Sequence, residues 1–147
     1  SSRRTAHGCT ALPEIGGFDH VSLPMQDTDA MLAFYRALGC EIAEHPAVVS
    51  VYAGDQMINF HRPALWQRGF SLRAPAAVPP CGDLCFVWQG SVASLQALLA
   101  GAGAEIEEGP VARDGGRRAQ GTSVYTRDPD GNLLEFIVYE GDGFNAR

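Results

Sequence analysis

Residues 50–60 read SVYAGDQMINF, and residues 123–136 read SVYTRDPDGNLLEF. The second stretch repeats the first: Ser50-Val51-Tyr52 matches Ser123-Val124-Tyr125, and Asp55 matches Asp128. Three further residues inserted in the second copy bring Ile58-Asn59-Phe60 onto Leu134-Glu135-Phe136. A repeat of this kind indicates one supersecondary unit used twice.

The match extends outward from these stretches to two earlier segments. The segment from His20 matches the segment from Asp83, and Gly39-Cys40-Glu41-Ile42 matches Gly103-Ala104-Glu105-Ile106. A duplicated unit folded about an approximate two-fold brings equivalent positions together. We therefore expect one shared site with four contributors: His20, Asn59, Asp83 and Glu135.

Apolar periodicity predicts the same order of elements in both copies. In the first copy we expect a strand over 18–25, a helix over 27–38 with Asp27 as N-cap and Gly39 as its end, and strands over 41–44, 48–53 and 57–62. In the second copy we expect a strand over 83–88, a helix over 91–102, a strand around Glu105, and two long strands flanking a turn at 128–132. The fold class is therefore α+β, with two βαβββ modules.

The alternation along the strands separates two faces. One face is apolar and belongs under the helices, and the opposite face carries a mixture of ionisable and apolar side chains that is unsuited to a dry core. We therefore predict a curved, mostly antiparallel sheet around a central cavity, with the helices outside and the ionisable groups within.

The length of 147 residues and the 46% apolar content suit one domain. We expect a flexible N-terminal tail over 1–14, a single domain over 15–142 and a short tail over 143–147. The domain divides into module one (15–62), a connecting loop (63–82) that is a candidate lid, and module two (83–142).

Charge and cysteine content narrow the function classes. The net charge of -6 and the pI near 5.1 argue against a nucleic-acid or anionic-membrane partner. No apolar run is long enough for a membrane span. The four cysteines lack the density of a disulfide scaffold, which favours a reducing, cytoplasmic location.

The chain resembles the vicinal oxygen chelate superfamily of glyoxalases, bleomycin and fosfomycin resistance proteins and extradiol dioxygenases. The resemblance rests on Phe18-Asp19-His20-Val21, on Phe34-Tyr35 with Leu38-Gly39, and on the run from Asp128 to Phe136. Three other segments resemble the small members called glyoxalase domain-containing protein 5 and their virulence-associated bacterial relatives: Ile58-Asn59-Phe60-His61, Asp83-Leu84-Cys85-Phe86 and Glu108-Gly109-Pro110-Val111-Ala112-Arg113.

The resemblance implies a divalent ion between the modules, held by one side chain from the first and last strand of each. Carried over residue by residue, these positions are His20, Asn59, Asp83 and Glu135. The second position is usually Glu, Gln or His and the third is usually His, so this chain departs from the pattern at both. His61 lies two residues beyond Asn59 on the same strand face, and either of the two is a candidate for the fourth contact.

The leading hypothesis is a metal-dependent enzyme of the glyoxalase or dioxygenase type, with lyase or isomerase activity favoured. The metal ligands would be His20, Asp83, Glu135 and His61, and Glu135 would also act as the catalytic base. A nitrogen-plus-oxygen ligand set suits Mn, Fe, Ni or Zn. Candidate substrate contacts are Asn59, Tyr125, Cys85 and Arg113, for a small molecule with vicinal oxygens.

The alternative is a metal-free binding protein of the bleomycin-sequestering type, in which His20 and Glu135 pair with each other. The resemblance and the paired modules also imply a homodimer.

Overall fold

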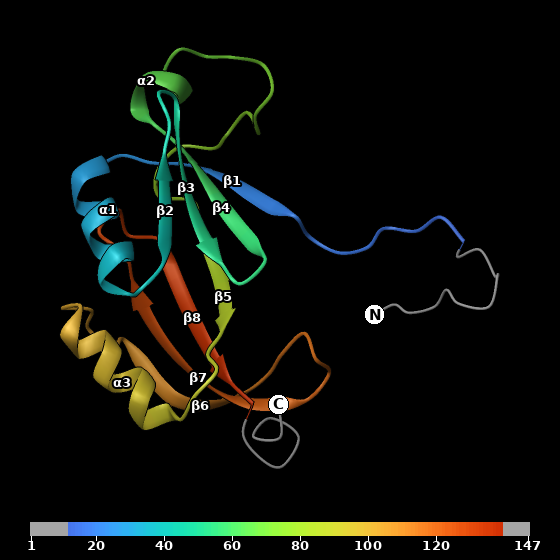
Figure 1. Ribbon diagram of the computed structural model, residues 1–147, viewed down its shortest axis with the longest axis vertical. Coiled ribbons are helices and arrows are strands. Elements are labelled where there is room, and N and C mark those ends of the chain that lie inside the picture. Colours follow the sequence, from blue (N-terminus) through green and yellow to red (C-terminus); the bar gives the residue numbers. More distant parts are fainter. Residues whose placement is uncertain (1–11, 140–147) are drawn as a thin grey trace.

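The computed structural model describes residues 12–139. Residues 1–11 and 140–147 lie outside the described residues. They include most of the predicted N-terminal tail (1–14) and all of the predicted C-terminal tail (143–147). Residues 12–19 form an exposed segment without regular structure that runs into the first strand (Figure 1).

Module one has the predicted order of elements. It comprises β1 (His20–Pro24), α1 (Thr28–Ala37), β2 (Glu41–Glu44), β3 (Val48–Ala53) and β4 (Gln56–His61). Helix α1 starts where Asp27 accepts a hydrogen bond from the Ala30 amide, and Gly39, at φ 90°, follows its end.

Module two repeats the arrangement with β5 (Asp83–Val87), α3 (Val92–Gly101), β6 (Glu108–Asp114), β7 (Gln120–Arg127) and β8 (Leu133–Val138). The N-cap of α3 is Ser91, whose hydroxyl accepts from the Ser94 amide. Both expected helices and seven of the eight expected strands therefore lie within a few residues of their predicted positions.

The strand expected around Glu105 is the exception, because β6 starts only at Glu108. The residues just before β6 contact β7 through isolated hydrogen bonds. The Thr126 hydroxyl donates to the Glu105 carbonyl, and the Glu107 amide donates to the Tyr125 carbonyl. The pairing of β6 with β7 then shifts register between Glu108 and Val111, where Pro110 has no amide hydrogen to donate.

The connector between the modules also differs from a plain loop. It contains a short helix, α2 (Pro63–Trp66). The indole of Trp66 donates to the Met25 carbonyl, which holds this helix against the end of β1.

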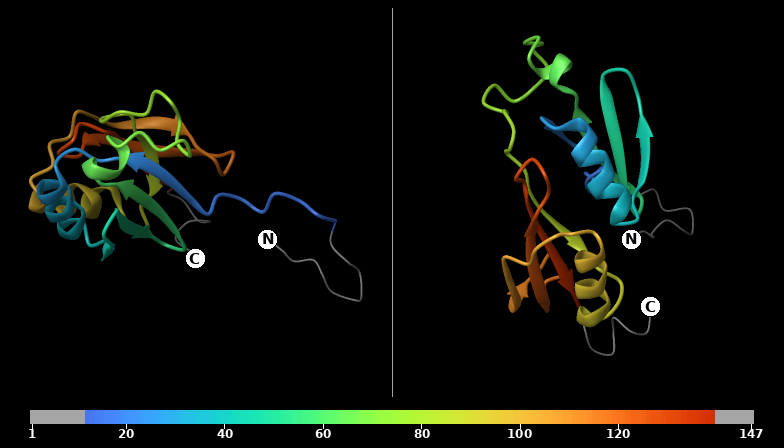
Figure 2. Two further views of the ribbon diagram at one scale, coloured as in Figure 1. Left: turned by 90° about the horizontal axis from the view of Figure 1, so that it is seen from above. Right: turned by 90° about the vertical axis from the view of Figure 1, so that its left-hand side faces the viewer.

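Each module forms a four-stranded sheet in which the first and last strands lie side by side. The orders are β1-β4-β3-β2 and β5-β8-β7-β6. The β1–β4 and β5–β8 pairs are parallel and the remaining pairs are antiparallel. The described residues thus form two mixed sheets, one per module, with α1 and α3 on the same side of the molecule (Figures 1 and 2).

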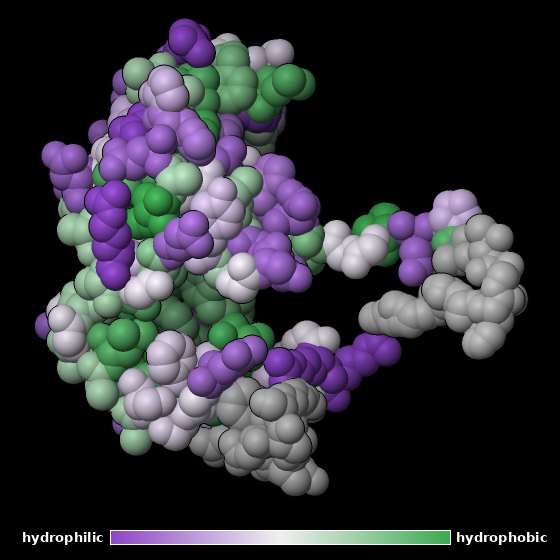
Figure 3. Space-filling view, viewed as in Figure 1, coloured by the Kyte–Doolittle hydropathy of each residue, from purple (hydrophilic) through white to green (hydrophobic). Residues whose placement is uncertain are grey.

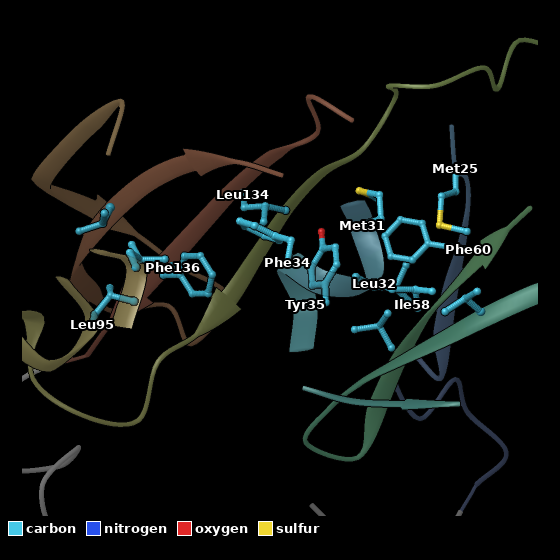
Figure 4. Close-up of a cluster of buried hydrophobic side chains, with 14 of the residues drawn as sticks. Met25, Met31, Leu32, Phe34, Tyr35, Ile58, Phe60, Leu95, Leu134 and Phe136 are labelled. Atoms are coloured by element: carbon cyan, nitrogen blue, oxygen red, sulfur yellow. The ribbon is translucent and has the colours of Figure 1, made fainter. Parts of the chain in front are cut away.

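One hydrophobic core joins the two modules. Figure 4 shows Phe34 and Tyr35 of α1 between Met31 and Phe60 of module one and Leu134 and Phe136 of module two. The Tyr35 ring lies 5.2 Å from Phe34 and 5.6 Å from Phe60. The apolar face of each sheet is therefore buried under the helices, as predicted.

The turn between β7 and β8 also connects the modules through polar contacts. The buried Asp128 carboxylate accepts a 2.7 Å hydrogen bond from the Tyr35 hydroxyl. Asp130 accepts from the amides of Gln26 and Asp27, at 2.7 and 2.8 Å. These two amides stand at the start of α1, where free N–H groups attract a carboxylate. The turn thus fastens module two onto the first helix of module one.

Candidate functional site

The polar face of the second sheet gathers four of the predicted site residues. Cys85 lies opposite Glu135 in the β5–β8 pair, and Tyr125 lies opposite Glu135 in the β7–β8 pair. Residues directly opposite one another on paired strands point to the same face. Arg113 extends this group, because its Nε donates to the Tyr125 hydroxyl at 3.0 Å.

Glu135 is held by a neighbouring strand. The hydroxyl of Ser123 on β7 donates to Glu135 Oε2 at 2.6 Å, and Ser123 is fully buried. A short hydrogen bond to a charged acceptor is the strong kind. The second group beside this carboxylate is the Cys85 thiol, whose pKa is raised by burial and then by the Glu135 carboxylate.

The equivalent contact recurs in module one. Ser50 on β3 donates to Asn59 Oδ1 at 3.0 Å. Ser50 and Ser123 are matching positions of the repeat, and so are Asn59 and Glu135. The serine is therefore the same in both modules, whereas the group that it contacts is an amide in module one and a carboxylate in module two.

His20 is oriented by its neighbour in the sequence. Its Nδ1 lies 2.7 Å from Asp19 Oδ2. A carboxylate on one ring nitrogen is the usual way to fix the tautomer of a metal-binding histidine, and it leaves Nε2 as the free ligand atom.

His20 and Asp83, on different modules, line the same pocket. The pocket has a volume of about 270 Å³, and its wall also includes Phe18, Met57 and Cys85. The first-strand residues of the two modules therefore share one pocket, while Asn59 and Glu135 are not part of its wall. Glu135 lies one strand further in, behind Cys85.

Cys85 stands between the pocket and Glu135. Burial raises the pKa of its thiol to about 12, and the neighbouring Glu135 carboxylate adds to the shift. The raised pKa favours the protonated thiol over the thiolate.

His61 lies away from His20. In the β1–β4 pair His20 is level with Met57 and His61 is level with Pro24, so the two histidines are offset by roughly 13 Å along the strands. The His61 ring contacts Phe70 of the connector at 5.4 Å. Burial, followed by the charge of Arg73, lowers the pKa of His61 and favours the neutral imidazole.

The donor atoms suit a divalent ion, but they do not lie in one coordination sphere. Nitrogen and oxygen donors of the predicted types are present in His20, Asp83 and Glu135. Among residues 12–139, however, no three His, Cys, Asp or Glu side chains stand close enough together to hold one ion.

Sequence reasoning missed the residues that orient these groups: Asp19, Ser50 and Ser123. The signal for the serines was present, because Ser50-Val51-Tyr52 and Ser123-Val124-Tyr125 open the repeated stretch on the strand next to the ligand position. Alternation along β3 and β7 places each serine on the polar face with its partner.

No protein-family model matches the chain. Among curated proteins, it is similar to a glyoxalase domain-containing protein of Mycosarcoma maydis, at 36% identity covering 86% of this chain and 70% of that protein. It is also 32% identical to a virulence protein of Salmonella typhimurium, covering 85% of each chain. The crystal structure of that virulence protein superimposes with a TM-score of 0.77, covering 87% of this chain and all of the other.

An integron cassette protein from Vibrio cholerae gives a similar result. It is 32% identical, has a TM-score of 0.77, and covers 88% of this chain and all of its own. In the described part of this chain, no helix has the length and apolar character needed to cross a membrane.

Proposed function

Because the chain belongs to the vicinal oxygen chelate superfamily, we propose that it is a divalent-metal-dependent enzyme acting on a small molecule with adjacent oxygens. Superfamily relatives of the glyoxalase, dioxygenase and fosfomycin-resistance types are enzymes, and relatives use divalent metals. A lyase or isomerase reaction is the form that we propose for this chain.

The observation that carries the proposal is the pocket shared by His20 and Asp83, with Glu135 one strand behind it. These three residues would hold the ion, through His20 Nε2, the Asp83 carboxylate and Glu135 Oε1. A bound ion of the manganese, iron, nickel or zinc type would supply Lewis-acid stabilisation of negative charge on the substrate oxygens. We place His61 outside this set because of its offset along β4.

The chain's own groups would handle the proton and the substrate. Glu135 would alternate between ligand of the ion and catalytic base that takes up a proton from the substrate carbon, while Ser123 continues to hold Oε2. Tyr125 and Arg113 would contact the substrate on one side of Glu135, and Asn59 would contact it from module one. The protonated Cys85 thiol would separate the pocket from Glu135 without reacting.

A metal-binding measurement tests the proposal. The purified protein is freed of metal, titrated with Mn²⁺ and with Zn²⁺, and compared with His20→Ala and Glu135→Ala. We expect one ion per chain in the wild type and a large loss of affinity in both variants. A wild type that takes up neither ion at millimolar concentration would rule the enzyme out.

The second candidate is a metal-free sequestering protein, and a specific observation favours it. The potential ligands of the described chain do not form a cluster of three, and the pocket that they line is small and partly apolar. If the titration finds no ion, the same protein is screened for binding of planar apolar compounds by tryptophan fluorescence. Binding that survives in Glu135→Ala would support the sequestering function.

We also propose a homodimer. Leu12, Ile15 and Phe18 stand more than four-fifths exposed on the segment before β1. Exposed apolar groups of this size on one segment favour a protein partner. Sedimentation equilibrium at micromolar concentration should show twice the chain mass, and a single monomeric species would contradict this.

A further inference from the structure

A groove runs along the outer edge of β5. This strand ends its sheet, so one row of its backbone N–H and C=O groups has no strand partner within the part of the chain that the structure describes. The pocket of His20 and Asp83 adjoins a second cavity of about 490 Å³, and Cys85 and Phe86 belong to both walls. Every residue from Asp83 to Gln89 lines one cavity or the other. Because consecutive side chains of a strand point to opposite faces, a wall that uses all of them follows the edge of the strand.

The second cavity of this β5 groove is mostly apolar. Its wall includes six aromatic and aliphatic side chains: Tyr35, Leu38, Phe86, Trp88, Leu98 and Phe136. Val87, at the end of β5, lines the same cavity and is 45% exposed. Figure 3 shows hydrophobic residues at the surface where the two modules meet. A free strand edge beside apolar side chains suits an extended apolar peptide, which can add to the sheet as a further strand.

A segment of that kind precedes β1. Residues 12–18, which we call the arm, stand clear of the two sheets (Figures 1 and 2). Three large apolar side chains of the arm are 83%, 94% and 81% exposed: Leu12, Ile15 and Phe18. Apolar groups of this size are thus in contact with solvent in the single chain, which favours a protein partner.

The arm and the β5 groove match in length and lie next to each other. Residues 12–18 and residues 83–89 are both seven-residue stretches, and each spans about 23 Å when extended. The side-chain amide of Gln56 donates to the Phe18 carbonyl at 3.4 Å, and Gln56 lines both cavities of the groove. In a two-fold dimer the same two surfaces meet twice, so an arm that starts beside the groove needs only a short reach to the groove of the other copy.

We propose that the arm of one copy lies in the β5 groove of a second copy of this chain, in a reciprocal exchange. This rests on the proposed homodimer and names the surfaces that form it. Leu12 and Ile15 would fill the apolar cavity, and the backbone of the arm would pair with the free edge of β5, except at Pro13, which has no N–H. Because the two cavities share part of their walls, each arm would also narrow the pocket of His20 and Asp83.

Sedimentation equilibrium of the full-length chain tests the exchange. The arm variant is Leu12→Ser with Ile15→Ser, the groove variant is Val87→Asp, and the matched control is Leu72→Ser, at a connector position that is 87% exposed. We expect the arm and groove variants each to raise the dimer dissociation constant at least about 100-fold, because apolar contacts are lost at both symmetric interfaces. Leu72→Ser should stay within about threefold of the wild type, and circular dichroism should show that every variant is folded.

Photocrosslinking separates the exchange from an arm that folds back on its own chain. The residue p-benzoylphenylalanine replaces Ile15, and unlabelled and nitrogen-15-labelled proteins are unfolded and refolded together before irradiation. Mass spectrometry then identifies the joined peptides. We expect adducts of mixed isotope composition that join position 15 to residues 83–89, with a yield that falls in Val87→Asp.

Three results would overturn the exchange while the homodimer stands: an arm variant that dimerises as tightly as the wild type, an equal loss in Leu72→Ser, or adducts from position 15 to residues outside the β5 groove. Adducts confined to single chains would show that the arm covers its own groove, which also rejects the exchange. A wild type that stays monomeric rejects the homodimer and the exchange together.

Discussion

Modules one and two share a strand order but contribute different groups to the candidate site. Module one supplies His20 and the helix that crosses to the other module, and its last strand carries the neutral Asn59. Module two supplies the turn that binds α1 and five ionisable groups of the candidate site: Asp83, Cys85, Arg113, Tyr125 and Glu135. The two modules thus share a scaffold, but both carboxylates of the candidate site, Asp83 and Glu135, lie in the second.

The largest expected difference between the modules lies in their hairpin turns. Asp128 is buried and accepts hydrogen bonds from Tyr35, from the Gly131 amide, and from the amide and side chain of Asn132. Its repeat partner Asp55 is exposed. We expect Asp128→Ala to lower the free energy of unfolding by about 3 kcal/mol, since several buried donors lose their acceptor.

Urea denaturation of the metal-free protein measures this, with Asp55→Ala as the matched control. We expect the control to stay within about 0.5 kcal/mol of the wild type. Equal effects in the two variants would mean that the fastening of the modules does not depend on the second turn.

The next difference lies in the outermost strand of each sheet, β2 in module one and β6 in module two. In module one, β2 pairs with β3 in a regular register, whereas β6 carries a bulge at Gly109. Gly109 has φ 106°, and a Cβ atom there would press on the Ser123 carbonyl oxygen. We expect Gly109→Ala to destabilise the fold by about 2 kcal/mol, because both the backbone and its neighbour must shift.

The control for this change is Gly116→Ala, at a position where a Cβ would meet nothing within 4 Å. Chemical denaturation of both variants gives the comparison. A Gly109→Ala protein as stable as Gly116→Ala would show that the bulge tolerates a side chain and has no strict requirement for glycine.

The charge asymmetry of the site can be reduced by one substitution. Asn59→Glu would give module one the carboxylate that module two already has, with Ser50 in place to hold it. Added ligand charge raises cation affinity, and we expect about a tenfold gain for Mn²⁺. Isothermal titration with Asn59→Gln as the uncharged control of equal length measures the change. No gain would mean that Asn59 does not face the ion.

The smallest effect concerns a feature that both modules share, an exposed glutamate paired with arginine. Hydrogen bonds from Arg36 and then Arg62 lower the pKa of Glu44, and a hydrogen bond from Arg127 lowers the pKa of Glu107. A lowered carboxyl pKa means that the stabilising contribution is present above the unfolded pKa of about 4.3 and is lost as pH falls through the folded value.

Carbon-13 NMR of the side-chain carboxyls should show both glutamates titrating below the ordinary value. In Arg127→Ala the pKa of Glu107 should rise to that value while Glu44 stays unchanged. Because the pair of Arg127 and Glu107 is exposed, Arg127→Ala should not shift the urea midpoint measurably. A Glu44 pKa that moves with Arg127→Ala would indicate coupling between the modules through charge.

The sequence predicted most of the fold, because the signals that determine its elements lie within short stretches of the chain. Alternation in strands, N-caps at Asp27 and Ser91 and the repeat itself fix the elements and their order. The late start of β6 was not predicted, because the sequence from Glu105 to Glu107 resembles its repeat partner in module one. The bulge at Gly109-Pro110 was not predicted either, because it depends on contacts with β7.

The candidate site was predicted less completely. The repeat predicted one shared site for His20, Asn59, Asp83 and Glu135, and of these four residues His20 and Asp83 line one pocket. Glu135 lies beside Cys85 because β8 pairs with β5 in this register, and periodicity does not encode which strands pair. The role of Asp128 and Asp130 in holding α1 was missed because their partners lie about a hundred residues earlier in the chain.

The connector has one consequence for how this protein can vary. His61, at the end of β4, pairs with Pro24, and Gly82, the last residue of the connector, lies against the side chain of the neighbouring Leu23. The connector therefore leaves and returns to nearly the same place, so a much shorter link could join the two modules. Loop closure entropy changes slowly with length. Insertions and deletions in the connector would change which ligands the protein admits, while the two modules keep their relative orientation.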